Sequence, residues 1–141
     1  MSDDGGSIMS MGERLRDAMN AHDIDALVDC FAEDYRSEQP AHPVRGFGGR
    51  DQVRANWSMI FAGVPNFSAE LVRSGATGDV EWSEWRWAGD RADGNRLEMA
   101  GIIVMGVRDD RIATGSLYME PVEAAGGADI TATVRTMAGD A

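Results

Sequence analysis

Hydrophobic positions recur at helical spacing in the first third of the chain. Ser10 and Glu13 match a capping box, and the apolar residues that follow predict a helix over about residues 9–21. Asp23 can cap a second helix. The apolar stripes of these two helices are Met11, Leu15, Ala18 and Met19, then Ile24, Leu27, Val28 and Phe31. We interpret both stripes as core-facing.

A short extended segment, residues 35–39, is expected next, followed by a loop over residues 40–49 that contains two prolines and a glycine cluster. Asp51 is expected to cap a third helix that extends to about residue 62. Its buried stripe is predicted to be Val53, Trp57, Ile60 and Phe61. Gly63 and Pro65 provide the signals that end it.

The pattern changes to strands from residue 67 onward. Strands are expected over residues 67–73, 79–88, 96–108 and 111–120, with turn residues between them. Helices followed by hairpin-linked strands predict an α+β domain with a curved antiparallel sheet and its helices on one face. Beyond Pro121, a Gly126-Gly127 pair precedes a weakly amphipathic tail around residues 130–137, where a short helix is possible.

The segment 79–88 holds three of the four tryptophans, and strand alternation divides it into two faces. One face carries Val80, Trp82, Glu84 and Arg86. The other carries Glu81, Ser83, Trp85 and Trp87. A glutamate and an arginine beside an indole suit a pocket, so we expect the first face to point into a ligand-binding cavity. The second suits a contact with a helix or another subunit.

Composition narrows the function. The 141 residues fit one domain, and a net charge of −11 without a basic cluster argues against nucleic acid or an anionic membrane as partner. No apolar run reaches membrane-spanning length. The single Cys30 cannot form an internal disulfide, and the acidic, glycine-rich start lacks the features of a secretory signal. We therefore expect a cytoplasmic protein, with residues 1–8 disordered.

Several stretches resemble the SnoaL-like group of the nuclear-transport-factor-2-like superfamily. They are Ala21–Leu27 (AHDIDAL), Phe31–Asp34 (FAED), Gly49–Val53 (GRDQV), Val107–Ile112 (VRDDRI) and Leu117–Glu120 (LYME). The resemblance implies a cystatin-like cone, or α+β barrel, over residues 9–122, with the N-terminal helices packed over the concave face of a curved antiparallel sheet and a tail over residues 123–141. It also implies a hydrophobic small-molecule ligand and a homodimer through the outer sheet face, to which we assign Trp85 and Trp87.

Members of that superfamily include limonene epoxide hydrolase, ketosteroid isomerase, scytalone dehydratase, polyketide cyclases and non-catalytic proteins. The hydrolase family has an arginine and an aspartate two apart on the middle strand and another aspartate on the last strand. The aligned positions here are Glu84, Arg86 and Leu117, while its Tyr and Asn fall near Arg36 and Glu38. The charged pair is reversed and the last carboxylate is missing, so this chain is not expected to use that triad.

Glu84 is the favoured general base, with Arg86 as its orienting or oxyanion partner. The alternative is a structural ion pair on the sheet. Glu38 is the second candidate carboxylate, with an exposed strand end as its alternative. His42, between two prolines in the loop expected to rim the cavity, is a further acid–base candidate, although a surface histidine is the commoner case.

Trp82, Trp57, Arg36 and Leu117 are expected to line the ligand site. Two histidines and one cysteine give a metal no ligand support, and no cofactor is expected. The resemblance implies cofactor-free proton transfer on a hydrophobic substrate: cyclisation, isomerisation, dehydration or epoxide opening. The alternatives are a non-catalytic binding protein and a dimeric accessory protein. A binder would be favoured if Glu38 and Glu84 were both held in ion pairs.

Overall fold

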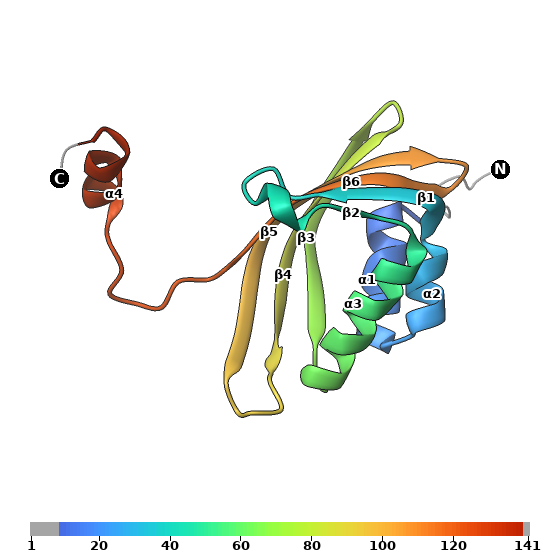
Figure 1. Ribbon diagram of the computed structural model, residues 1–141, viewed down its shortest axis with the longest axis horizontal. Coiled ribbons are helices and arrows are strands. Elements are labelled where there is room, and N and C mark those ends of the chain that lie inside the picture. Colours follow the sequence, from blue (N-terminus) through green and yellow to red (C-terminus); the bar gives the residue numbers. More distant parts are fainter. Residues whose placement is uncertain (1–8, 140–141) are drawn as a thin grey trace.

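A computed structural model describes residues 9–139. Its elements are α1 (Met11–Ala21), α2 (Ile24–Asp29), β1 (Phe31–Glu38), the 3₁₀ turn η2 (Pro43–Arg45), β2 (Phe47–Gly48), α3 (Arg50–Gly63), β3 (Ser68–Thr77), β4 (Val80–Asp90), β5 (Arg96–Arg108), β6 (Arg111–Pro121) and α4 (Ile130–Met137). Helices α1, α2 and α3 lie on one side of the curved sheet, and α4 stands apart from it (Figure 1). The disorder expected for residues 1–8 falls outside the described residues.

The sheet has six strands in the order β2-β1-β6-β5-β4-β3. Its neighbours are antiparallel except for β1 and β6, which are parallel. No hairpin joins β1 to β6, because most of the chain lies between them, so their relative direction is free to be parallel. The predicted α+β cone, with helices over the concave face, is confirmed, and this one pair makes the sheet mixed.

The segment between α2 and α3 is more regular than its sequence indicates. β1 begins at Phe31, four residues before the expected strand, and β2 pairs with it inside the expected loop. Gly49 rather than Asp51 is the residue before α3, and it has a φ of 91°. That left-handed conformation favours glycine, so the glycine cluster lets the chain turn sharply from β2 into the helix.

Helix α1 is anchored to the sheet by Glu81 on β4. The carboxylate of Glu81, only 8% exposed, accepts hydrogen bonds from the backbone N–H of Met11 at 3.1 Å and of Gly12 at 3.3 Å. The predicted capping box is present, with Ser10 and Glu13 bonding each other's backbone N–H. The first N–H groups of α1 are thus paired, and a buried negative charge meets the positive end of the helix dipole.

The alternation expected for β4 is present, but the face chosen to point inward is wrong. Trp85 is 0% exposed and Trp87 is 7% exposed, whereas Trp82 on the opposite, convex face is 39% exposed. Burying two indoles removes more apolar surface from water than burying one beside a glutamate and an arginine. Hydrogen bonds from the first backbone N–H groups of α1 offset the free energy of desolvation of the Glu81 carboxylate. The assignment of Trp85 and Trp87 to an outer-face dimer contact is therefore also wrong.

Inside the core, Trp85 has a hydrogen-bond acceptor for its indole. Trp85 Nε1 donates to Ser83 Oγ at 2.7 Å, and Ser83 Oγ donates to the carbonyl oxygen of Ile103 at 3.1 Å. This chain of bonds allows both side chains to be fully buried. Trp85 is consequently a structural residue of β4, and its indole is linked through Ser83 to the backbone of β5.

We predict that Glu81→Gln destabilises the protein by about 1–3 kcal/mol, because it removes the charge and turns an amide donor toward backbone donors. The free energy of unfolding can be measured by urea denaturation. Glu84→Gln, on the exposed face of the same strand, is the matched control and should change it by less than about 1 kcal/mol. Equal stability of the two variants would contradict the anchoring role of Glu81.

Candidate ligand-binding cavity

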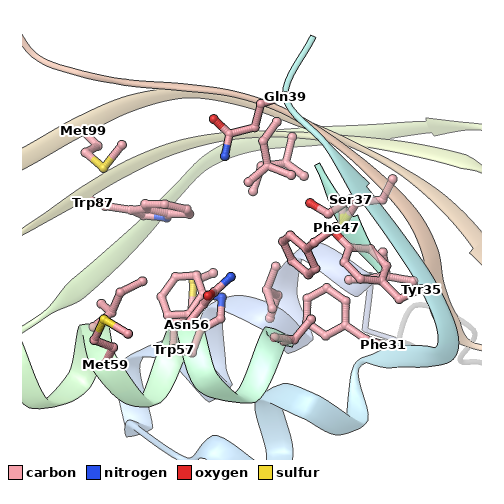
Figure 2. Close-up of a pocket in the computed structure, with 18 residues that line it drawn as sticks. Phe31, Tyr35, Ser37, Gln39, Phe47, Asn56, Trp57, Met59, Trp87 and Met99 are labelled. Atoms are coloured by element: carbon pink, nitrogen blue, oxygen red, sulfur yellow. The ribbon is translucent and has the colours of Figure 1, made fainter. Parts of the chain in front are cut away.

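A cavity of about 460 Å³ lies between the concave face of the sheet and helices α1 and α3. Figure 2 shows the side chains that surround it. They come from both helices, from five of the strands and, at Gln39, from the loop after β1: Leu15, Met19, Phe31, Tyr35, Ser37, Gln39, Phe47, Val53, Asn56, Trp57, Met59, Ile60, Trp87, Met99, Ile103, Met105, Ile112 and Leu117. Such a volume falls in the range of small-molecule sites.

The lining is mostly apolar and its polar groups are uncharged. The polar groups of the lining residues are the hydroxyls of Tyr35 and Ser37, the amides of Gln39 and Asn56, and the indole N–H groups of Trp57 and Trp87. A ligand in this cavity therefore exchanges water for hydrophobic contact and for a few neutral hydrogen-bonding groups.

An aromatic cluster forms the wall between α3 and the sheet. The ring of Trp57 meets those of Trp87 and Phe67 edge to face, with centroids 5.4 and 5.5 Å apart, and Phe61 packs behind them. Edge-to-face packing of large rings fixes their orientation. Trp57 thus positions the ring of Trp87 at the cavity surface.

Tyr35 and Ser37 project from β1 on the same face, two residues apart. Both are buried, and burial raises the pKa of the Tyr35 hydroxyl above its ordinary value, while a hydrogen bond with Ser37 opposes this rise. A Cβ at Gly115 on β6 would overlap the Tyr35 hydroxyl, so glycine at that position makes room for it. At neutral pH the cavity consequently holds Tyr35 as a phenol, a proton and hydrogen-bond donor.

The sheet register separates the polar groups into two ends. Ser37 pairs with Gly115, which is opposite Met105, whereas Trp87 is opposite Met99. Those two positions are six residues apart along β5, about 20 Å along a strand. Ile103 and Leu117, which pair with each other, lie between the ends. The cavity therefore has an apolar middle, with Tyr35 and Ser37 toward one end and Trp87 toward the other (Figure 2).

Two of the residues expected to bind ligand, Trp57 and Leu117, line the cavity. Trp57 does so from α3 and Leu117 from the middle of β6. Their placement is compatible with the expected role, and ligand binding by either residue stays a prediction.

Trp82, Glu84 and Arg86 lie instead on the convex face of β4. Glu84 forms an ion pair with Arg73 of β3, and the side chain of Arg86 is exposed opposite Glu70. The expected arrangement, in which this face supplied a base, its partner and an indole to the cavity, is corrected by the burial of the alternate residues. Glu84 is thus held in an ion pair on the sheet surface, but its partner is Arg73 and not Arg86, as the alternative had supposed.

Glu38, His42 and Arg36 also lie outside the cavity lining. Glu38 accepts a hydrogen bond from Ser116 Oγ at 2.9 Å, and His42 Nε2 lies 2.8 Å from a carboxylate oxygen of Glu120. Arg36 is exposed on the same face of β1 as Glu38. The expected loop histidine is thus paired with the end of β6, and the structure does not bring these three groups to one point.

The polar residues of the cavity were missed for a simple reason. Tyr35, Ser37 and Gln39 alternate with Arg36 and Glu38, and the resemblance to the family predicts that the charged set points inward. The signal available in the sequence was the apolar ring of Tyr35, which belongs with the buried positions of β1. Asn56 precedes the correctly placed Trp57, but nothing in its local pattern distinguishes it.

Within residues 9–139, no three His, Cys, Asp or Glu side chains converge as a metal site would require. In the same part of the chain, no helix combines the length and apolar character needed to cross a membrane.

The fold and the cavity define a cone-shaped α+β domain of the nuclear-transport-factor-2-like class. Residues 13–114 match the sequence profile of the SnoaL-like domain, and the chain belongs to this family, as its motifs indicate. Among curated proteins the sequence has no significant match.

Solved structures share this fold at low sequence identity. A Catenulispora acidiphila protein with a ketosteroid isomerase-like fold, in complex with trimethylamine, has a TM-score of 0.68 and 17% identity over 79% of this chain and 86% of its own. An LEH-like epoxide hydrolase from M. tuberculosis has a TM-score of 0.67 and 20% identity over 78% and 80%. A candidate SnoaL-like polyketide cyclase from Jannaschia sp. CCS1 has a TM-score of 0.65 and 17% identity over 78% and 83%.

Proposed function

We propose that this protein binds a neutral, hydrophobic small molecule in the cavity between α1, α3 and the sheet. The observation that carries the proposal is the lining: aromatic, aliphatic and methionine side chains, whose polar groups are all uncharged. Burial of apolar ligand surface supplies the affinity, and the polar groups orient the molecule. A charged ligand would lose its hydration without gaining a partner of opposite charge.

The positions of the carboxylates favour binding over acid–base catalysis by a glutamate. Glu84 is paired with Arg73 on the convex face, and Glu38 is bonded to Ser116 outside the lining. A general base must lie within hydrogen-bond reach of the proton that it removes. Neither glutamate has this relation to a molecule inside the cavity, which supports the non-catalytic alternative of a ligand-binding protein.

The binding proposal predicts that Leu117→Trp, which fills the middle of the cavity, weakens the binding of the neutral dye Nile red by about ten-fold or more. Dye fluorescence titration measures the affinity. Tyr118→Trp adds the same indole at the next residue, on the exposed face of β6, and should leave affinity unchanged. If Nile red did not bind the wild-type protein, or bound Leu117→Trp equally well, the cavity would not be its site.

A second candidate is cofactor-free proton-transfer catalysis, the function suggested by the named epoxide hydrolase and cyclase of the same fold. The observation that favours it is Tyr35, a buried phenol among the residues that line the cavity, which is protonated at neutral pH. Its hydroxyl could donate a hydrogen bond to a ketone oxygen as an enol forms, while water takes the proton from the α-carbon. Positioned proton donors typically contribute about 10²–10⁴-fold to a rate.

This second candidate predicts accelerated exchange of the α-protons of 2-tetralone in D₂O, followed by NMR. Tyr35→Phe should abolish the acceleration, and Glu84→Gln, on the opposite sheet face, should retain it. Exchange at the buffer rate with wild-type protein would exclude this catalysis for simple ketones and leave the binding proposal standing.

We also propose a homodimer through the convex sheet face, with a different tryptophan from those first expected. Trp82, Val80 and Tyr118 are 39%, 43% and 46% exposed, and Trp82 pairs in the register with Val104. Tyr118 pairs with Ile102, so these side chains form one apolar patch across β4, β5 and β6. Covering such a patch with a second copy removes its apolar surface from water.

The dimer proposal predicts that Trp82→Glu shifts the protein to a monomer in sedimentation equilibrium at micromolar concentration, because it places a charge in the contact. Val44→Glu, at an apolar residue that is 97% exposed in the η2 turn, should leave the dimer intact. A wild-type protein that sediments as a monomer would contradict the proposal.

A further inference from the structure

Helix α4 has an apolar face that no part of the described domain covers. Ile130, Val134 and Met137 recur at i, i+4 and i+7, so they lie on one side of the helix, and they are 75%, 51% and 81% exposed. Figure 1 shows α4 apart from the sheet and from the other helices. Asp129 caps its first turn, but a helix of eight residues is too short to be stable in water by itself. Its stability requires a surface on which the apolar face can pack.

The mouth of the cavity is an apolar surface of this kind. Met59 of α3 lines the cavity and is nevertheless 71% exposed, so the lining reaches solvent at this residue. Met99 of β5 and Leu117 of β6 also line the cavity and are only half-buried. Figure 2 shows Met59 and Met99 on opposite sides of the open space. Methionine side chains are flexible, so they adapt to an apolar surface that packs on them.

The linker to α4 begins at this mouth. Pro121, the last residue of β6, is opposite Met99 in the sheet register. Residues 122–129 connect it to α4 and can span at most about 28 Å, which exceeds the roughly 20 Å between the two ends of the cavity. Gly126 has a φ of 98°, and the pair Gly126-Gly127 lets the linker change direction. The starting point and the length of the linker thus allow α4 to reach Met59.

The tether favours the cavity of the same molecule over that of a second copy. A short flexible linker holds the two surfaces at an effective concentration in the millimolar range, which a second copy at micromolar concentration does not match. In the proposed dimer the convex sheet faces meet, so the cavity of the other protomer lies on the far side of both sheets.

We propose that α4 is a lid whose apolar face closes the cavity mouth by packing on Met59 and Met99, and that it opens to exchange the bound molecule. The control of exchange rests on the proposed binding function, whereas the docking of α4 does not. Closure removes the exposed side chains of Ile130, Val134 and Met137 from water together with the methionines of the mouth.

The first test measures how fast Nile red leaves the protein after stopped-flow dilution. A bound molecule escapes only while the lid is open, so Val134→Glu, which places a charge in the apolar face, should raise the release rate about five-fold or more. Thr136→Glu places the same charge on the opposite side of the helix and should leave the release rate unchanged. Equal release from the wild type and both variants would overturn the lid, and so would equal acceleration by both variants.

The second test needs no ligand. The double variant Met59→Cys/Val134→Cys should form an intramolecular disulfide under mild oxidation, detected by mass spectrometry of the monomer. Met59→Cys/Thr136→Cys is the control and should oxidise more slowly, because position 136 faces away from the mouth when α4 is docked. The native Cys30 is 2% exposed and does not compete. Equal oxidation rates of the two pairs would overturn the proposal. Disulfide-linked dimers in place of the internal bond would also overturn it, because α4 would then pack on a second copy.

Failure of the lid is distinct from failure of the binding proposal. If Nile red does not bind the wild-type protein, the binding proposal fails, and the disulfide rates still decide whether α4 docks at the mouth. If Nile red binds but leaves Val134→Glu at the wild-type rate, the binding proposal stands and the lid is excluded.

Discussion

The pairing of the Glu81 carboxylate with the first N–H groups of α1 determines how the rest of the domain is arranged. A buried carboxylate needs donors, and the N-terminus of a helix supplies them together with a favourable dipole. Together with the burial of Trp85 and Trp87, the bond holds one face of β4 toward the helices, because a shift of one residue would reverse every side chain on the strand. It also places α1 over the sheet, where Leu15 and Met19 become part of the cavity wall.

The cavity stays open because rigid groups meet at its boundary. Trp57, Trp87 and Phe67 hold one another edge to face, and Tyr35 is packed against the backbone at Gly115. Rings fixed in this way cannot collapse into the space between the helix layer and the sheet.

The fold was predictable from local signals, and the site was not. The capping box at Ser10, the cap at Asp23 and the strand from 96 to 108 all appear as their patterns indicate, since neighbouring residues determine them. Which face of a strand is buried depends on distant partners. Glu81 is charged, so its local sequence predicts an exposed side chain. Its carboxylate is nevertheless buried, because it accepts a hydrogen bond from the backbone N–H of Met11, seventy positions earlier in the chain. Nothing in the local sequence indicates that contact. Because the opposite face of β4 points inward, every candidate residue predicted on this strand lies outside the cavity.

The parallel pairing of β1 with β6 bears on how the protein is made. Glu38 and Ser116 are hydrogen-bonded across 78 positions of sequence, so the strand that carries Tyr35 and Ser37 leaves the ribosome long before its neighbour exists. Until synthesis reaches β6, the aromatic side chains of β1 have no sheet to join, and contacts of such separation close slowly. The side chains of β1 that will line the cavity therefore stay exposed until β6 is synthesised, and that interval is when a chaperone has most to protect.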